Sequence, residues 1–431
     1  MSNQSGLETG AHVEQLRFLT TDDVNRVADQ WGTPVFVYDE GTLRERAAQA
    51  LALEEVIPHE LTVRYAMKAN PNRHILQVFD DMGIHIDASS GFEAERAIRA
   101  GIDPKHIMIT TQELPKNLEE MVGKGVLFNA CSLHQLDEYG KLFPGTNVSV
   151  RMNPGKGSGH SNKTNVGGPS SSFGIWHEYT DQIKEIATNH DLSINRLHTH
   201  IGSGTDPAVW LQVVQMSLAQ VENFPEVEVL NLGGGFKIAR MQDEIATDLT
   251  EVGQVVGQAL MDFEERTGRQ LRLEIEPGTF LVANAGSLVT TIHDMVDTGE
   301  AGYRFLKIDS GMTEIMRPNL YGAQHPLVVV NDRAEGHEKY VVVGHCCESG
   351  DLLTPYPGDP EAIAERLMDK AAIGDKLVIE GVGAYCAYMS AQNYNSFPLR
   401  PEVMRKVGGS MVEICRRETM DEMLALENQT A

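Results

Sequence analysis

The sequence predicts an α/β fold, a (β/α)8 barrel of the TIM type, followed by a C-terminal all-β domain. Eight short runs rich in β-branched and apolar residues alternate with segments of helical spacing between residues 62 and 276. After about residue 285, further strands follow one another with few helical stretches between them. An open doubly wound sheet is the alternative to the barrel, and eight matching units favour the barrel.

The strands of the barrel are expected, in chain order, at residues 62–67, 83–88, 106–111, 126–131, 147–152, 196–201, 227–232 and 271–276. Segments between them, such as 91–101 and 211–224, repeat apolar residues every three or four positions, which is typical of helices that cover a sheet. We therefore place the barrel at 33–284, after an N-terminal segment, 1–32.

The C-terminal domain, 285–431, is expected to be mostly β. Its strands are predicted at 287–296, 303–309, 325–331, 339–345 and 376–381, each bounded by turn residues. The run TPVFVYD at 33–39 precedes the barrel and is a candidate to join this domain, which would make the domain discontinuous. A helical tail is expected at 418–427.

Composition excludes several classes of function. The chain has 61 acidic and 36 basic residues, a net charge of −25, whereas nucleic-acid binding depends on clustered Lys and Arg. No apolar run approaches the roughly 20 residues that cross a bilayer. The first 15 residues lack the basic start and apolar core of a signal peptide. We expect a cytoplasmic protein without nucleic-acid or membrane partners.

The cysteines indicate neither a disulfide framework nor a metal site. There are five, an odd number, and no two are spaced as C-x-x-C. His198 and His200 form an H-x-H pair on a strand, but no further ligand with suitable spacing accompanies them. We expect free thiols and no bound metal, and for these histidines either packing in the barrel or contact with a ring.

Unusual polar and glycine residues follow the barrel strands at their carboxyl ends, where barrels of this kind place their chemistry. These residues are Lys68, Asp87, Asn153, His200, Gly233 and Glu276. Lys68 ends a strand of core character, and burying an isolated ammonium there would cost several kcal/mol without compensation. We expect these residues to share one rim.

Two glycine-rich segments follow neighbouring strands. In NLGGGF (231–236) three glycines allow backbone N–H groups to approach an anion, and HIGSG (200–204) adds the hydroxyl of Ser203. A glycine-rich strand end such as NLGGGF, taken alone, is more often a plain tight turn. Together, at adjacent strand ends, they favour a phosphate site.

A phosphate site, a buried carboxylate, a flat side chain and a lysine together describe a site for pyridoxal 5′-phosphate. Glu276 would pair with a protonated ring nitrogen, and His200 would stack on the ring. Lys68 would bind the cofactor covalently, with its pKa lowered by burial. The alternative for Glu276 is a salt bridge to a lysine or arginine of the barrel.

Eight motifs, found in the same order, resemble those of the diaminopimelate decarboxylase family, which are fold-type III, alanine-racemase-like enzymes. They are YAMKAN (65–70), HTHIGSG (198–204), NLGGGF (231–236), EPGTFLVANAG (276–286), RPNLYGAQHP (317–326), CESGD (347–351), GAYCAYMSAQNYNS (383–396) and RPEVM (400–404). The resemblance covers about residues 30 to 420. It implies a cofactor-binding barrel, a β domain and a head-to-tail homodimer that shares its active sites.

The resemblance also implies roles for individual residues. The catalytic residues are Lys68, His200 and Cys347, with Cys347 of the partner subunit as proton donor. The cofactor-binding residues are Lys68, Asp87, His200, Ser203, Gly233, Gly234, Gly235, Glu276, Pro277, Gly278, Thr279 and Tyr385. The substrate-binding residues are Arg317, Tyr321, Glu348 and Tyr385. Cys346, beside Cys347, is expected to be structural filler, because neighbours in an extended segment point oppositely.

The sequence departs from this family at the residue after EPG. The family has an arginine there that helps bind a distal carboxylate, and this chain has Thr279. Gly204 also stands where the family has glutamine. Both changes favour a substrate with a distal amine and no distal carboxylate, so we expect a D-lysine or D-ornithine decarboxylase. The alternative is meso-diaminopimelate decarboxylase, which forms L-lysine.

Two other classes of protein share the same barrel. An amino-acid racemase needs a second base and lacks the CESGD segment, which is present here at 347–351. A catalytically silent cofactor-binding relative loses the lysine, phosphate-binding or cysteine residues, all of which are present. The sequence therefore favours a carboxy-lyase over both.

Overall fold

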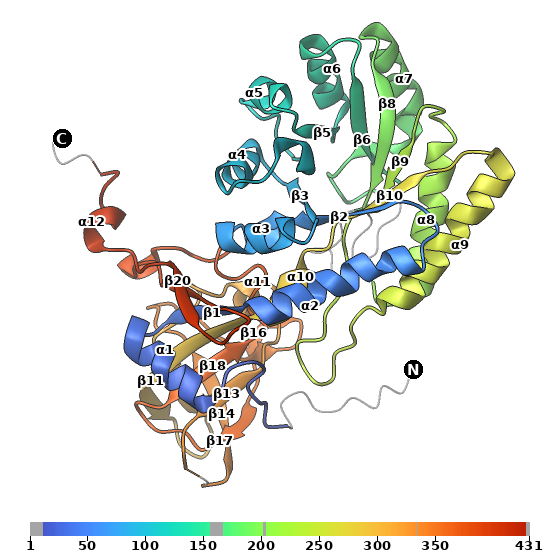
Figure 1. Cartoon of the computed structure of the whole chain (residues 1–431). Helices are drawn as coiled ribbons and strands as arrows, with labels where there is room; N and C mark the ends of the chain where they lie inside the picture. Colours follow the sequence, from blue (N-terminus) through green and yellow to red (C-terminus); the bar gives the residue numbers. More distant parts are fainter. Residues whose placement is uncertain (1–11, 156–166, 201–203, 334, 428–431) are drawn as a thin grey trace. The chain divides into compact units, whose positions relative to one another are not determined.

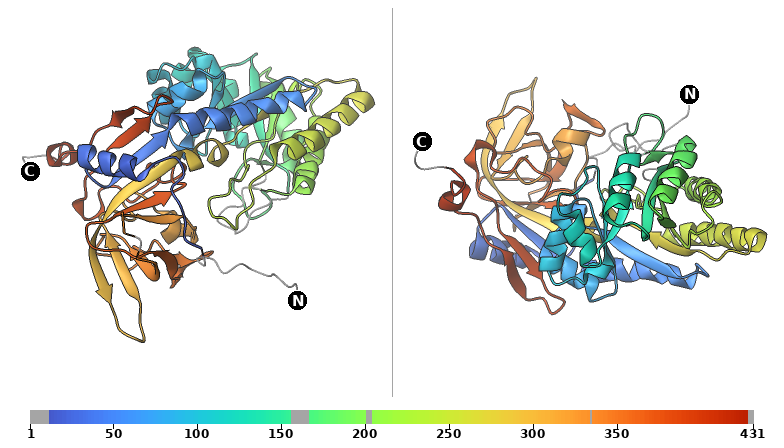
Figure 2. Two further views of the ribbon diagram at one scale, coloured as in Figure 1. Left: turned by 60° about the horizontal axis from the view of Figure 1, so that its bottom comes forward. Right: turned by 90° about the horizontal axis from the view of Figure 1, so that it is seen from above.

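The computed structural model describes residues 12–155, 167–200, 204–333 and 335–427. The chain forms two compact units (Figures 1 and 2). The barrel unit comprises residues 43–238 and 245–281, and the β unit comprises residues 1–42, 239–244 and 282–431. The barrel unit thus lies inside the expected range 33–284. Three stretches of that range, 33–42, 239–244 and 282–284, belong to the β unit instead, and the first contains the run 33–39 that was a candidate to join it.

The barrel unit is built on a closed sheet of parallel strands. The strand order is β5-β4-β3-β2-β10-β9-β8-β6, and β6 also pairs with β5, which closes the barrel. Its strands are β2 (Leu61–Ala66), β3 (His85–Ala88), β4 (Ile107–Thr110), β5 (Leu127–Ala130), β6 (Asn147–Asn153), β8 (Ser193–Thr199), β9 (Val229–Asn231) and β10 (Arg272–Ile275). All eight expected strands are present, so the barrel is confirmed and the open doubly wound sheet is wrong. A two-residue strand, β7 (Ile175–Trp176), adds to β6.

Helices precede or follow the strands along the chain and lie outside them (Figure 1). They are α2 (Glu40–Leu51), α3 (Arg73–Asp80), α4 (Gly91–Arg99), α5 (Leu118–Gly123), α6 (Leu133–Leu142), α7 (Thr180–Asn189), α8 (Pro207–Val221), α9 (Leu249–Thr267) and α10 (Thr279–Val282). Several begin at a residue whose side chain accepts an N–H of the first turn, which fixes the helix start. These residues are Asn72, Ser90, Ser132, Asp206 and Asp248.

The β unit contains a nine-stranded sheet in which the main path runs β17-β14-β12-β11-β1-β19-β20, while β18 pairs with β11 and β13. Its strands are β1 (Val35–Asp39), β11 (Gly286–Asp297), β12 (Arg304–Ile308), β13 (Leu327–Val330), β14 (His337–Val343), β17 (Arg366–Asp369), β18 (Lys376–Glu380), β19 (Glu402–Arg405) and β20 (Met411–Cys415). A separate hairpin joins β15 (Pro355–Tyr356) and β16 (Asp359–Ile363). The predicted sheet-rich domain is confirmed.

Strand β1 lies in the middle of this sheet, antiparallel to β11 and parallel to β19. Helix α1 (Thr21–Trp31) contributes Val24 and Val27 to a core that also contains Val35 and Val37 of β1. The unit has two further short helices, α11 (Arg317–Tyr321) and α12 (Met420–Met423). The helical tail is therefore shorter than the expected 418–427.

Among the described residues, no helix combines the length and the apolar composition that crossing a membrane requires. The cytoplasmic location stays a prediction from the sequence.

Candidate active site

The carboxyl ends of the barrel strands gather the residues that the sequence singled out. Lys68 lies in a short 3-10 turn, Met67–Ala69, after β2, and Asp87 lies near the end of β3. His200 and Glu276 directly follow β8 and β10. Because all strands of a closed parallel barrel end at one rim, these side chains share that rim. Electrostatic interactions of Lys68 with Asp87, His200 and Glu276 are consistent with this placement.

Lys68 is exposed, and the expectation of a desolvated lysine is wrong. The strand β2 ends two residues earlier, at Ala66, so the lysine does not belong to the buried sheet. Its neighbours Met67 and Ala69 are buried and anchor the turn. The ammonium at this rim therefore avoids the cost of burial and can meet a ligand from solvent.

Glu276 is the buried carboxylate of the rim. Its Oε2 lies 3.0 Å from Nε2 of His198, and its Oε1 accepts a 2.7 Å hydrogen bond from Nδ2 of Asn231. Burial opposes the charged form, but His198, His200 and Lys68 outweigh it and lower the pKa of Glu276 to about 2. The carboxylate is therefore ionised, and among the described residues its partners are a histidine and an amide, not the expected alternative of a lysine or arginine.

Asp87 has the opposite charge state. Burial and the charge of Glu276 raise the pKa of Asp87 to about 8, against the opposing effects of Lys68 and a hydrogen bond to Thr110. Its Oδ1 is buried and has no hydrogen-bond partner among the described residues. Two carboxyl groups near one another seldom both ionise in a buried site. At neutral pH Asp87 is mostly protonated, while Glu276 carries the charge.

His200 packs its ring on the glycine-rich segment. Its Nδ1 accepts a 3.1 Å hydrogen bond from the N–H of Gly234, and burial lowers its pKa well below the usual value, so the ring is neutral. A side chain at Gly233 would place its Cβ 2.4 Å from that ring, and one at Gly234 would meet the carbonyl oxygen of Glu276 at 2.4 Å. Glycine is therefore required here by packing alone.

The structure leaves fewer glycine N–H groups available to a phosphate than the sequence suggested. Gly233 donates its N–H to Oδ1 of Asn231 at 2.8 Å, and the N–H of Gly234 goes to His200. Two of the three glycine N–H groups thus have partners within the chain, and Gly235 has a positive φ (+107°), a backbone conformation that favours glycine. Ser203, the hydroxyl assigned to this site, lies outside the described residues.

Sequence reasoning missed a polar layer inside the barrel, next to the rim. Glu274 on β10 accepts from Nη2 of Arg64 at 2.9 Å and lies 3.2 Å from Nε of Arg196. Asn231 bridges Glu274 and Glu276 with its amide, at 3.2 and 2.7 Å. The sequence signal that could have revealed this layer is the presence of polar residues within otherwise apolar strands. The layer links β2, β10, β9 and β8 inside the barrel, next to the rim formed by the carboxyl ends of the strands.

The segment after Glu276 is also fixed. The carbonyl oxygen of Pro277 accepts the N–H of Ala66 at 3.2 Å, and Gly278 is buried. Thr279 is half-buried and begins α10.

Among the described residues, no cluster of three or more His, Cys, Asp or Glu side chains could hold a metal ion.

The two adjacent cysteines of the β unit differ in environment. Cys346 is buried, its N–H donates to Asp351 at 2.9 Å, and burial together with Asp351 raises the pKa of its thiol to about 12. Cys347 is exposed, and its N–H donates to Oδ1 of Asn395 at 2.8 Å. Glu348 is exposed beside it. Only Cys347 is open to a ligand.

The remaining residues expected to bind substrate also lie in the β unit. Arg317 and Tyr321 begin and end α11, and both are half-buried. Tyr385 has a left-handed backbone (φ +57°), which is uncommon for a bulky residue. These residues, with Cys347 and Glu348, belong to one unit, and the rim residues belong to the other.

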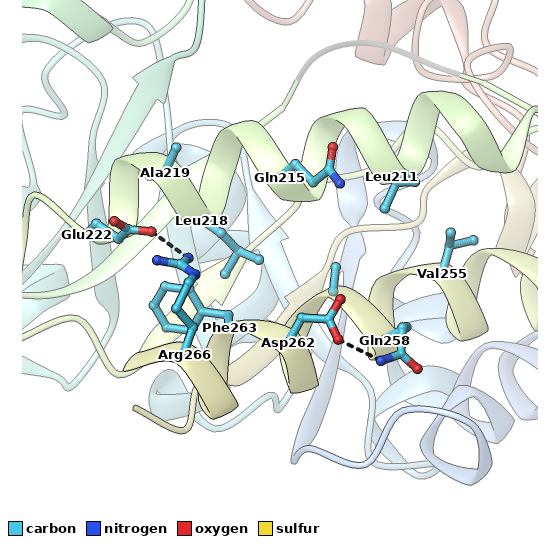
Figure 3. Close-up of a pocket in the computed structure, with 11 residues that line it drawn as sticks. Leu211, Gln215, Leu218, Ala219, Glu222, Val255, Gln258, Asp262, Phe263 and Arg266 are labelled. Atoms are coloured by element: carbon cyan, nitrogen blue, oxygen red, sulfur yellow. Dashed lines mark hydrogen bonds and ion pairs between the residues drawn. The ribbon is translucent and has the colours of Figure 1, made fainter. Parts of the chain in front are cut away.

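A groove on the outside of the barrel unit contains none of these residues. It lies between α8 and α9, which run in the same direction, with Leu211 and Val255 near one end and Glu222 and Arg266 near the other (Figure 3). Arg266 pairs with Glu222 across it. The groove is therefore separate from the rim.

Comparison with known proteins decides the family. Residues 42–283 match the family model described as pyridoxal-dependent decarboxylase, pyridoxal binding domain. The diaminopimelate decarboxylase of Escherichia coli (strain K12) is 36% identical over 420 residues, which cover 95% of this chain and 97% of that protein.

The chain belongs to the diaminopimelate decarboxylase-like family of pyridoxal-dependent decarboxylases.

Solved structures of this decarboxylase family agree. A crystal structure of diaminopimelate decarboxylase matches with a TM-score of 0.88 and 34% identity, covering 96% of this chain and 97% of that one. The M. jannaschii enzyme in co-complex with L-lysine matches with a TM-score of 0.83 and 27% identity, covering 94% of each chain. The protein is therefore a carboxy-lyase that depends on pyridoxal 5′-phosphate.

The described rim fits this cofactor. Lys68 supplies an accessible amine, and Glu276 is ionised with two of its several lone-pair positions in use. Oδ1 of Asp87 is buried without a partner, which suits a site completed by a ligand. The neutral ring of His200 is held against the glycine-rich segment by the N–H of Gly234, and a flat ring of this kind can contact another ring.

Proposed function

We propose that this decarboxylase acts on meso-diaminopimelate and releases CO2 and L-lysine. Similarity to diaminopimelate decarboxylases over almost the whole chain carries the proposal. Only the carboxylate of the D-configured centre leaves, so the product keeps the carboxylate and the amine of the other end. The M. jannaschii relative in complex with L-lysine supports a product of this kind.

D-Lysine or D-ornithine, the substrate that the sequence favoured, becomes the second candidate. It depends on Thr279, which stands where an arginine would bind a distal carboxylate. The diaminopimelate decarboxylases that match this chain favour the first candidate instead. Arg317 in the β unit can still bind a carboxylate, so the absence of one arginine does not exclude a substrate with two carboxylates.

Residues of the barrel rim would hold the cofactor. Lys68 would bind it covalently, Glu276 would keep a proton on the ring nitrogen, and His200 would lie on the ring. The carboxylate of Glu276 is suited to this task because its pKa is far below neutral pH. The phosphate end would be bound by the segment 233–235 and by Tyr385. Pyridoxal phosphate supplies a sink for the electron pair that remains when CO2 leaves.

Residues of the β unit would bind the substrate and return the proton. The exposed thiol of Cys347 would donate a proton to the carbon that has lost CO2, and Glu348 would bind the distal amine. Arg317 and Tyr321 would bind the distal end. We also propose the head-to-tail homodimer implied by the family, in which Cys347 serves the site of the partner subunit.

The proposal is tested by measuring CO2 release from meso-diaminopimelate, D-lysine, D-ornithine, L-lysine, L-ornithine and L-arginine in parallel assays of the holoenzyme. We expect meso-diaminopimelate to have the highest kcat/KM and L-lysine to be its product. A preference for D-lysine or D-ornithine would support the second candidate and overturn the first.

A further inference from the structure

Two arginines of the β unit influence each other electrostatically, and neighbouring carbonyl groups hold one of them directly and the other through a histidine. Nε of Arg240 donates to the carbonyl oxygen of Gly381 at 2.9 Å. His325 donates from Nδ1 to the carbonyl oxygen of Glu380 at 3.0 Å, and its Nε2 lies 3.3 Å from Nε of Arg317. Adjacent backbone carbonyls, at 380 and 381, therefore anchor both guanidinium groups.

These two guanidinium groups have no carboxylate partner. Neither Arg240 nor Arg317 lies within ion-pair distance of a carboxylate among the residues that the structure describes. Arg240 is only 8% exposed, and its Nη2 has no hydrogen-bond partner there. A buried, incompletely satisfied cation beside a second cation is costly unless an anion joins them.

Nearby carboxylates are engaged elsewhere. Glu244 accepts the backbone N–H groups of Arg240 and Met241, at 2.6 and 3.2 Å. Glu380 accepts the hydroxyl of Ser287 at 2.6 Å, and burial raises its pKa. Burial and the charge of Arg317 lower the pKa of Arg240 to about 9, against the opposing effects of Cys386 and Glu244, neither of which makes an ion pair with it.

The chain nevertheless holds Arg240 in place. Nδ2 of Asn284 donates to the carbonyl oxygen of Ala239 at 2.9 Å, and the guanidinium of Arg17 donates to the carbonyl oxygen of Arg240. Gly381 has a left-handed backbone (φ +69°), and a Cβ there would lie 3.1 Å from Cγ of Arg240. A fixed, desolvated guanidinium is the arrangement that proteins use to bind carboxylates with two hydrogen bonds.

Another buried arginine of the same unit shows the contrast. Nη2 of Arg400 lies 3.5 Å from Oε1 of Glu402, so its charge is balanced within the chain. Arg240 has no such partner. A purely structural role would leave its Nη2 unsatisfied, whereas a bound anion would satisfy it and neutralise the pair.

We propose that Arg240 and Arg317 together bind the carboxylate at the far end of the amino-acid substrate, the one that remains in the product. This rests on the proposed function, in which the substrate has two carboxylates. Thr279 cannot supply a second cation, and Arg240 does so from a different part of the chain. Arg240 is thus a specificity-determining residue that separates substrates with and without a distal carboxylate.

The test compares two ligands that differ by one carboxylate, L-lysine and 1,5-diaminopentane, by calorimetric titration of the holoenzyme. We expect the wild type to bind L-lysine more tightly. Arg240→Gln should weaken L-lysine binding roughly 10- to 100-fold, the effect of losing a charge-assisted pair of hydrogen bonds, and leave 1,5-diaminopentane unchanged. Arg240→Lys keeps the charge and loses the paired N–H donors of the guanidinium. It should show a smaller loss of affinity for L-lysine and again leave 1,5-diaminopentane binding unchanged.

Arg366→Gln is the matched control. Arg366 on β17 is also buried in the β unit with unpartnered nitrogens, and carboxylates act on it as Glu244 acts on Arg240, but the charge of Arg317 is not among the influences on its pKa. We expect this variant to keep the preference for L-lysine. If circular dichroism shows that Arg240→Gln does not fold, the same comparison of ligands is made with Arg240→Lys and Arg317→Lys.

Three results would overturn the inference. They are equal binding of both ligands by the wild type, an equal loss for both ligands in the Arg240 variants, and a loss of bound cofactor absorbance without a change in ligand preference. Failure of the proposed function is a separate result, because it appears as absent CO2 release from meso-diaminopimelate by the wild type.

Discussion

At the scale of single residues, the rim separates two carboxyl groups into two charge states. Asp87 and Glu276 are both buried, yet Glu276 has His198 and Asn231 as partners, while Oδ1 of Asp87 has none among the described residues. The pKa of Glu276 falls to about 2, and that of Asp87 rises to about 8. A carboxylate that stays charged at every physiological pH is the form that can hold a proton on a nearby ring nitrogen.

This difference predicts a pH dependence of stability. The pKa of Asp87 is raised in the folded chain, so between about pH 4 and pH 8 the folded state keeps a proton that the unfolded state loses, and stability falls as pH rises. Asp87→Asn removes this titration. In thermal unfolding of the cofactor-free chain, we compare the free energy of unfolding of the variant with that of the wild type. The difference in favour of the variant should grow from pH 5 to pH 8, by up to about 1.4 kcal/mol per pH unit. A gap that does not change with pH would contradict the assignment.

The two neighbouring cysteines give a second prediction. Cys347 is exposed and Cys346 is buried against Asp351, so only Cys347 can reach a substrate. Cys347→Ala should lose most turnover and keep the visible absorbance of the bound cofactor, while Cys346→Ala should keep turnover. The measurement is steady-state CO2 release together with the absorption spectrum, and the reverse pattern would identify Cys346 as the acid.

The sequence located the polar residues of the rim better than it described their surroundings. Lys68, His200 and Glu276 could be found because each is a polar residue at the end of an apolar strand, where a barrel places its chemistry. The exposure of Lys68 could not be predicted, because it depends on where the strand stops and on which neighbouring strands cover it. The role of Asn231 as a hydrogen-bond donor to two carboxylates was missed, because an asparagine just before a run of glycines is typical of the start of a turn.

At the scale of elements, a polar layer joins four strands of the barrel. Glu274 on β10 lies between Arg64 on β2 and Arg196 on β8, and Asn231 on β9 connects it to Glu276. All of these side chains are buried or nearly so. The layer therefore fixes the register of the strands whose ends form the rim.

Removing the central charge should be costly. Glu274→Gln leaves the buried Arg64 and the half-buried Arg196 without their counter-charge, and we expect a loss of about 3–5 kcal/mol in the free energy of unfolding. Glu228→Gln is the matched control, because Glu228 makes an exposed pair with Arg272 at 3.4 Å, and such pairs contribute less than about 1 kcal/mol. Denaturant unfolding measures both, and equal losses would contradict the role given to the layer.

The elements themselves were largely predictable. The barrel strands are buried almost throughout, so they appear in sequence as compact apolar runs, and turn residues bound them. The segment 239–244 was not predictable as part of the β unit, because nothing local marks six residues that leave one unit for the other. Arg240, within that segment, was missed for the same reason.

At the scale of the whole molecule, the chain builds its β unit from three separate stretches. β1, near the start, pairs with β11 and with β19, more than 240 and 360 residues later. The barrel is inserted between these stretches. The proposed residues are divided in the same way, with the cofactor-binding lysine in one unit and the proton-donating cysteine in the other.

If active sites are shared between subunits, two inactive variants should restore each other. Lys68→Ala and Cys347→Ala subunits should each be inactive alone and regain part of the wild-type activity after mixing and exchange, because a mixed dimer contains one intact site. Size-exclusion chromatography with light scattering gives the oligomeric state. Activity that stays at background in confirmed mixed dimers would contradict the shared site.

The most direct measurement follows CO2 release from meso-diaminopimelate and the visible absorption of the protein in the same sample, for the wild type and Lys68→Ala. We predict one L-lysine for each CO2 and a visible cofactor band in the wild type, and neither in the variant. A colourless, inactive wild type supplied with pyridoxal phosphate, or a variant that turns over as fast as the wild type, would contradict the account.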